Sequence, residues 1–180
     1  MYLNEKKISS KEIYDGKVVK LFCDDVELEN GMKTKREIIH HPGGVCIAAL
    51  DEEQNVFFVK QFRYPFSTAL MEVPAGKLEF GEDHKECGIR ELKEEIGATA
   101  EKFEYMGCIY PTVAYDTEVI HMYLAEGLSF GEQHLDEGEF LDVIKIPLKK
   151  AFEMVMNNEI PDAKTQAAIM KAYILKNNIK

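Results

Sequence analysis

The segment from residue 70 to residue 97 constrains the fold most, because it combines a strand, a loop and a helix in direct succession. Residues 70–74 are mainly apolar and predict a strand, and residues 76–81 begin and end with glycine and predict a loop. Residues 83–96 have the pattern of a helix, and Gly97 follows at the position where a helix commonly ends. Loops held between such elements often carry functional side chains.

Strands and helices are mixed along the rest of the chain. Apolar runs at 45–50 and 56–62 flank the polar residues 51–55 and predict a hairpin. Further strands are expected at 102–110, 118–125 and 143–146, and further helices at 148–156 and 163–175. This mixture favours an α+β fold with a mixed sheet over a doubly wound fold. Neither a Gly-x-Gly-x-x-Gly sequence nor a phosphate-binding Gly-Lys-Ser/Thr loop is present.

A small antiparallel sheet is predicted near the N-terminus. Strand-like runs lie on both sides of Asn30-Gly31, and this pair favours a hairpin because both residues tolerate positive φ. The sequence His41-Pro42-Gly43-Gly44 then interrupts the pattern. We therefore expect an N-terminal arm at 1–41 and a main domain at 42–180. Sheets of two or three strands are marginally stable alone, so the arm is expected to pack on another surface.

Charge and cysteine content narrow the function classes. The chain of 180 residues has 22 Lys+Arg against 32 Asp+Glu, a net charge of −10, which disfavours binding to a nucleic-acid backbone or an anionic membrane. Four widely spaced cysteines predict reduced thiols rather than a zinc site: Cys23, Cys46, Cys87 and Cys108. No apolar run is long enough to span a membrane, and residues 1–7 lack the apolar core of a secretory signal. A cytoplasmic location is expected.

Acidic side chains gather on one edge of the helix predicted at 83–96. With about 100° of rotation per residue, Glu91 and Glu95 lie about 40° apart, and Glu94 lies beside them. Carboxylates without nearby His or Cys suit Mg²⁺ or Mn²⁺, which prefer oxygen ligands. The alternative is an acidic helix face exposed to solvent, which needs no ligand.

The same helix is expected to face the core with a separate apolar stripe made of Ile89, Leu92 and Ile96. Gly88 lies in the helix interior, where glycine costs roughly 1 kcal/mol relative to alanine. Two explanations are open for it: a close approach of the loop at Ala75-Gly76, or close packing of another kind.

The spacing of these residues resembles the Nudix box. Gly76 is followed after five residues by Glu82, and after seven more by Arg90-Glu91-Leu92-Lys93-Glu94-Glu95-Ile96-Gly97. The box reads Gly-x5-Glu-x7-Arg-Glu-apolar-x-Glu-Glu-x-Gly-apolar, and Ala98 stands where a larger aliphatic residue is usual. The resemblance covers about residues 15–175 and is greatest to the ADP-ribose pyrophosphatase branch. It implies a Nudix-type α/β/α sandwich in addition to the small N-terminal sheet.

The resemblance also implies roles for individual residues. Expected to bind divalent cations are Glu91, Glu94, Glu95 and the carbonyl of Ala75. Glu82 and Arg90 are counted with the catalytic residues and are expected to hold the loop against the helix through a charge-assisted pair. Glu137 and Glu139 match the late-loop glutamate that orients or deprotonates water, with Glu137 preferred. Expected to contact the substrate are Arg36, Arg63, Glu72 and Pro111.

The activity implied by the resemblance is Mg²⁺-dependent hydrolysis of ADP-ribose to AMP and ribose 5-phosphate, with Mn²⁺ as the alternative cofactor. A pyrophosphate resists attack because its oxygens are anionic, so the site must neutralise charge. Alternative substrates are another nucleotide sugar, such as GDP-mannose, or a dinucleotide. A non-catalytic nucleotide sensor is disfavoured because all the box glutamates are present. The branch further implies a homodimer in which the arm completes the partner's nucleotide pocket.

Overall fold

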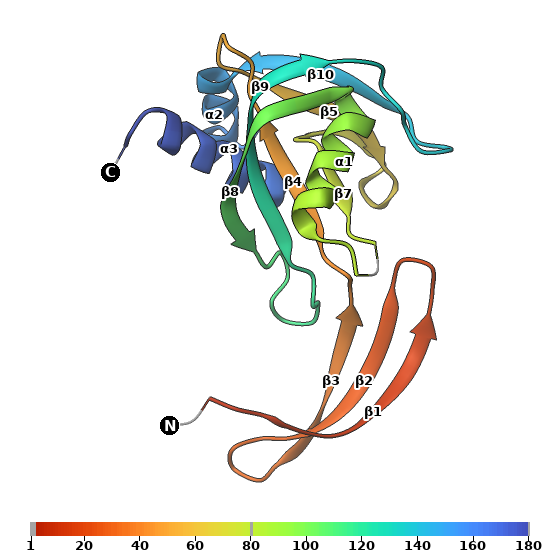
Figure 1. The fold of residues 1–180 in the computed structure, drawn as a ribbon. Helices are drawn as coiled ribbons and strands as arrows, with labels where there is room; N and C mark the ends of the chain where they lie inside the picture. Colours follow the sequence, from red (N-terminus) through yellow and green to blue (C-terminus); the bar gives the residue numbers. More distant parts are fainter. Residues whose placement is uncertain (1–2, 80, 180) are drawn as a thin grey trace. The chain divides into compact units, whose positions relative to one another are not determined.

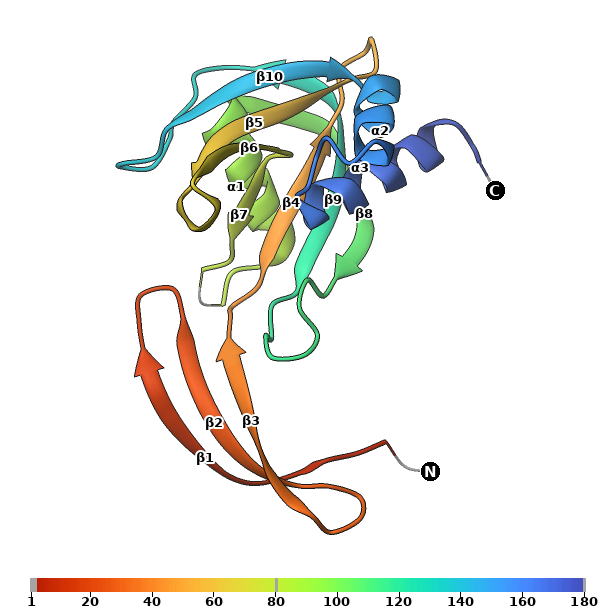
Figure 2. The ribbon, with the colours of Figure 1, turned by 180° about the vertical axis from the view of Figure 1, so that it is seen from behind.

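The structure is a computed structural model, and it describes residues 3–79 and 81–179. Figures 1 and 2 show the order of its elements from two opposite sides. Contacts divide the chain into two compact units. The first is Met1–Gly43 with Tyr110–Val119, and the second is Gly44–Ile109 with Ile120–Lys180.

The first unit is built on a three-stranded antiparallel sheet with the order β1-β2-β3. Its strands are β1 (Lys6–Asp15), β2 (Lys20–Glu27) and β3 (Lys33–His40). Gly31, in the turn between β2 and β3, has φ +80°, so the predicted hairpin is confirmed. Residues 110–119 join this unit because Ile39 donates its N–H to the carbonyl of Tyr115 (2.7 Å) and accepts from the N–H of Thr117 (3.0 Å).

In its described residues, the second unit contains two sheets and three α-helices. A mixed sheet has the order β7-β4-β9-β8, in which only β4 and β9 are parallel, and an antiparallel sheet has the order β10-β5-β6. The strands are β4 (Gly44–Ala49), β5 (Asn55–Arg63), β6 (Thr68–Glu72), β7 (Ala75–Lys77), β8 (Ala98–Ile109), β9 (Ile120–Phe130) and β10 (Leu141–Pro147). The helices are α1 (His84–Ile96), α2 (Leu148–Met156) and α3 (Ala163–Lys176), with a short 3-10 helix, η1 (Tyr64–Phe66).

Strand β4 is buried on both faces and divides the core in two. Cys46, Ala48 and Leu50 pack in one cluster with apolar residues of α2 and α3. The alternate residues Val45, Ile47 and Ala49 pack in the other cluster with residues of α1. Because successive strand residues point to opposite faces, α1 covers one face of the mixed sheet and α2 and α3 cover the other (Figures 1 and 2). The expected α+β fold with an α/β/α sandwich is confirmed.

The hairpin predicted around residues 51–55 is only partly correct. The turn forms, since the N–H of Asp51 donates to the carbonyl of Asn55 (3.0 Å) and Leu50 forms an antiparallel bridge with Val56. Beyond that bridge β4 and β5 separate and join different sheets. The polar turn is encoded locally, whereas the partner of each strand depends on residues distant in sequence.

Two further findings concern the cysteines and the helices. All four cysteines are free thiols, as predicted, with Cys46 and Cys87 buried. In residues 3–79 and 81–179, no helix has the length and apolar character needed to cross a membrane.

Candidate active site

Helix α1 presents the acidic residues of the site and has well-defined ends. The side chain of Asp83 accepts from the N–H groups of Lys85 and Glu86 at the N-terminus, and Gly97 adopts a left-handed conformation at the C-terminus with φ 66°. The apolar stripe is partly wrong: Leu92 and Ile96 are buried, but Ile89 is 39% exposed. The helix is rotated so that the buried side of α1 includes the carboxylate of Glu95.

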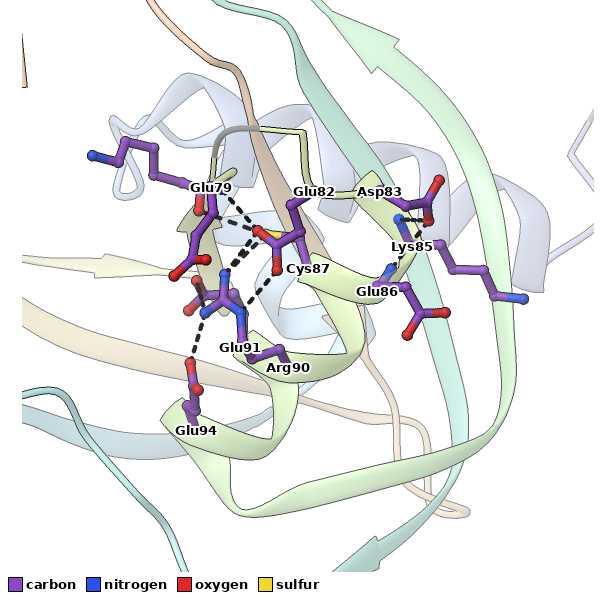
Figure 3. Close-up of polar contacts among 10 residues, drawn as sticks. Glu79, Glu82, Asp83, Lys85, Glu86, Cys87, Arg90, Glu91 and Glu94 are labelled. Atoms are coloured by element: carbon purple, nitrogen blue, oxygen red, sulfur yellow. Dashed lines mark hydrogen bonds and ion pairs between the residues drawn. The ribbon is translucent and has the colours of Figure 1, made fainter.

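Arg90 is the centre of a charge network on α1 (Figure 3). Its Nε donates to Glu82 Oε1 (3.0 Å), and its Nη1 donates to Glu91 Oε1 (2.7 Å) and Glu94 Oε2 (2.8 Å). The Arg90 guanidinium lowers the pKa of the Glu82 carboxyl to about 2. Glu82 also accepts the N–H of Glu79 (2.8 Å), so the pair ties the loop after β7 to the helix.

Glu95 is the most buried carboxylate of this group. It is 4% exposed, and its Oε2 accepts the N–H of Ala75 at 2.8 Å. Burial raises the pKa of Glu95 to about 8, and the negative charges of Glu91 and Glu139 act in the same direction. The charge of Glu95 is therefore poorly compensated within the protein.

Glu91 lies beside β7 and is also largely buried. Its pKa is raised by burial, against the opposing effect of Arg90. A Cβ atom at Gly76 would overlap the Glu91 carboxylate, so the close approach in this region occurs at Gly76. Gly88 instead faces Phe103, whose ring would lie 2.9 Å from an added Cβ, so packing is the explanation for that glycine.

The donor set fits a hard divalent cation. Glu95 is buried and Glu91 is largely buried, and the pKa values of both are raised, an effect that a bound cation would oppose. In the part of the chain that the structure describes, no three His, Cys, Asp or Glu side chains converge closely enough to hold a metal ion. Arg90 holds Glu91 and Glu94 in ion pairs, so loading the site requires these side chains to shift.

The two late-loop glutamates differ in their surroundings. Glu139 is half-buried, and its Oε1 accepts from Gln61 Nε2 on β5 at 3.0 Å. Its charge raises the pKa of both Glu91 and Glu95. Glu137 is exposed. Of the two, Glu139 is the one that acts electrostatically on the buried carboxylates.

Comparison with known proteins assigns the chain to a family. The family model described as NUDIX domain matches residues 40–171 of the sequence. The chain belongs to the Nudix family. It is 44% identical to an ADP-ribose pyrophosphatase of Bacillus subtilis (strain 168), covering 93% of this chain and 91% of that protein. It is 42% identical to a methanol dehydrogenase activator of Bacillus methanolicus, covering 92% and 90%.

A solved structure supports the Nudix fold independently of sequence. The structure described as an ADP compounds hydrolase superposes with a TM-score of 0.86 at 16% identity and covers 99% of this chain and 97% of its own. At that level of identity the likeness concerns the fold alone.

Four residues predicted to contact substrate are distributed over both units of this Nudix protein. In the second unit, Arg63 donates through Nε and Nη2 to the two oxygens of Glu72 (2.6 and 2.7 Å). In the first unit, Arg36 donates in the same forked manner to Glu5 (2.9 and 2.6 Å). Pro111 belongs to the segment Tyr110–Val119 of the first unit.

Sequence reasoning missed Lys164, which forms an ion pair with Glu72 inside the Nudix domain. The two residues are 92 positions apart, and no spacing rule connects them. The available signal was Asp162, a helix-capping residue type directly before the helix predicted at 163–175.

Proposed function

We propose that this chain hydrolyses the pyrophosphate bond of ADP-ribose and releases AMP and ribose 5-phosphate. The observation that carries the chemistry is the pair of neighbouring carboxylates with raised pKa values, the buried Glu95 and the largely buried Glu91. The substrate is suggested by the relative named ADP-ribose pyrophosphatase, which is 44% identical over nearly the whole chain.

Mg²⁺ is the proposed cofactor, with Mn²⁺ as the alternative. Glu91 and Glu95 would hold it, with Glu94 and the carbonyl of Ala75 as further ligands. When bound, such an ion neutralises the anionic phosphate oxygens and makes phosphorus open to attack. Glu82 and Arg90 support this arrangement by holding the loop and the helix together, because the Arg90 guanidinium on the helix donates to both carboxylate oxygens of Glu82 in the loop.

A glutamate of the late loop would accept a proton from the attacking water. The new bond forms between the water oxygen and one phosphorus, the bridging P–O bond breaks, and the departing phosphate takes up the negative charge. We assign this role to Glu139 in preference to Glu137, because its charge acts on Glu91 and Glu95.

Arg63 would contact the substrate, with Glu72 behind it as its buried ion-pair partner. Pro111 is kept as a proposed contact, and Arg36 of the arm would contact the nucleotide bound by the partner subunit. We further propose that the protein is a homodimer, because a three-stranded sheet cannot bury both of its faces by itself. In this assignment Arg36 exchanges Glu5 for a phosphate or base when the nucleotide binds.

A substrate panel tests the function. ADP-ribose, GDP-mannose and a dinucleotide are each incubated with the protein, with and without Mg²⁺, and the products are separated by ion-exchange chromatography. The expected result is AMP and ribose 5-phosphate from ADP-ribose, only with the metal. Binding of ADP-ribose without turnover would instead identify a nucleotide sensor, and faster turnover of another compound would reassign the substrate.

A further inference from the structure

A buried charge network joins α3 to the end of β6, and its central group is Glu72. This carboxylate is 2% exposed and accepts from Arg63 on one side and from Lys164 Nζ on the other. Lys164 Nζ also lies 3.1 Å from Asp162 Oδ1. Two cations and two carboxylates thus lie together inside the second unit, and Arg63 and Lys164 share the carboxylate of Glu72.

The first turn of α3 is fixed against this corner by further contacts. Asp162 caps the helix by accepting the N–H of Thr165 (2.9 Å). The fully buried Thr165 accepts the N–H of Val73 through Oγ1 at 2.9 Å. The backbone of Lys164 is therefore held in this turn, and its side chain, which is 14% exposed, is paired with both Glu72 and Asp162.

Arg63 has an unused edge. Its Nε and Nη2 donate to Glu72, whereas Nη1 has no hydrogen-bond partner among residues 3–79 and 81–179. The side chain is 39% exposed, and its positive charge acts on Glu95. An anion that reaches the carboxylate cluster can therefore meet this edge of the guanidinium.

The charge on Glu72 decides how attractive that edge is. If Arg63 were its only partner, the full negative charge of a desolvated carboxylate would offset the guanidinium. Because Lys164 shares the same carboxylate, part of the positive charge of Arg63 stays uncompensated. Burial alone would raise the pKa of Glu72, but Arg63 and Lys164 together lower it to about 2, so the carboxylate stays ionised between them.

We propose that Lys164 is a positioning residue that keeps Arg63 competent to bind a phosphate group, acting through Glu72 and not touching the ligand itself. This inference rests on the proposed function, because it assigns Lys164 to the same phosphate-binding site.

The test measures binding of inorganic pyrophosphate by calorimetry, alongside the steady-state kinetics of ADP-ribose hydrolysis. For Lys164→Met we expect the Kd for pyrophosphate and the KM for ADP-ribose to rise about tenfold, the size of one charge-assisted hydrogen bond, with kcat nearly unchanged. Lys164→Arg should restore both values. The matched control is Lys176→Met, which removes a different lysine–glutamate pair, with Glu126, from the same helix and should leave both values unchanged.

A double substitution separates action through Glu72 from direct contact. In the Glu72→Gln background, adding Lys164→Met should produce no further rise in Kd or KM. A further rise would overturn the inference, because it would mean that Lys164 meets the ligand directly. An unchanged Kd in Lys164→Met alone would also overturn it.

Folding failure and functional failure remain distinguishable. If Lys164→Met does not fold, Glu72→Gln/Lys164→Met replaces the pair with neutral residues and is compared with Glu72→Gln, while Lys164→Arg must retain the parent Kd. If the parent does not hydrolyse ADP-ribose, the proposed function fails, and the pyrophosphate Kd series still decides the role of Lys164.

Discussion

At Gly76, the addition of a single methyl group should lower activity much more than stability. This glycine lies in β7, where the extended backbone accepts alanine, but the added Cβ would overlap the Glu91 carboxylate. Glu91 is flexible at that end, so we expect Gly76→Ala to cost about 1 kcal/mol or less in free energy of unfolding. Turnover and Mg²⁺ affinity should fall sharply, as measured by product release and metal titration.

The control for this substitution is Gly131→Ala, where the nearest atom would lie 3.9 Å from the new Cβ. It should match the parent in both stability and turnover. Full activity in Gly76→Ala would remove Glu91 from the metal site.

Glu95→Gln tests the buried carboxylate itself. An amide oxygen can still accept the Ala75 N–H, and a carboxyl with a pKa of about 8 is already largely neutral near pH 7 without metal, so the substitution costs the fold little. We expect the metal-free variant to have an unchanged or higher melting temperature and a turnover lower by orders of magnitude at saturating Mg²⁺. Glu94→Gln, on a more exposed side chain, should have the smaller effect. Activity within a few-fold of the parent would contradict the assignment of Glu95.

The late loop supplies a pairwise comparison. Because Glu139 interacts electrostatically with Glu91 and Glu95 and Glu137 is exposed, Glu139→Gln should lower kcat more than Glu137→Gln. The kcat values of both variants are compared at saturating Mg²⁺ and ADP-ribose. The reverse order would transfer the proton-accepting role to Glu137.

For individual residues of the site, helical periodicity predicts which ones share a side of α1, but not which side of the helix is buried. Helical spacing places Glu91 and Glu95 on one side of α1, but it does not say that Glu95 is buried and Ile89 exposed. That rotation is decided by what packs against the helix. Lys164 could not be predicted, because its contact with Glu72 exists only after β6 and α3 have come together.

At the scale of elements, the network around Glu72 couples β5, β6 and α3, and it should respond to acid. The pKa of Glu72 is about 2 in the folded protein against a usual 4.5, so the unfolded chain takes up the proton first as pH falls. The stability from Glu72 is therefore fully present above about pH 5 and is lost as pH falls toward 2. Between pH 6 and pH 3 this loss is about 2 kcal/mol.

Urea unfolding at pH 6 and at pH 3 measures this effect. The parent should be more stable than Glu72→Gln by a margin that shrinks by this amount at the lower pH. Glu104→Gln, on the exposed surface of β8, is the matched control. A margin independent of pH for Glu72→Gln would show that the ion pairs do not stabilise the folded state.

The ranges of individual helices and strands could be predicted from the sequence better than the pairing of the strands. The range predicted for α2, residues 148–156, is the one observed, and the glycine at 97 ends α1 as expected. The separation of β4 and β5 into two sheets was not predictable, because the apolar pattern of each strand is the same in either arrangement.

At the scale of the whole molecule, the proposed dimer can be tested on the full chain. Every residue of β1 is exposed, and Ile8 and Ile13 are 47% and 51% exposed. Truncation at Pro42 is a less direct test, because it would also remove Ile39, the backbone partner of Tyr115 and Thr117. Substitution on β1 leaves that part of the first unit intact.

We expect the parent to sediment as a dimer and Ile8→Lys/Ile13→Lys to sediment as a monomer, because buried lysine charges oppose association through this sheet. The monomer should keep its affinity for Mg²⁺ but show a raised KM for ADP-ribose, since the dimer is proposed to bring Arg36 to the partner's nucleotide. Ile174→Lys, at an isoleucine of α3 that is 44% exposed, should remain dimeric. A monomeric parent, or a monomeric double variant with an unchanged KM, would reject the role assigned to the first unit and to Arg36 with it.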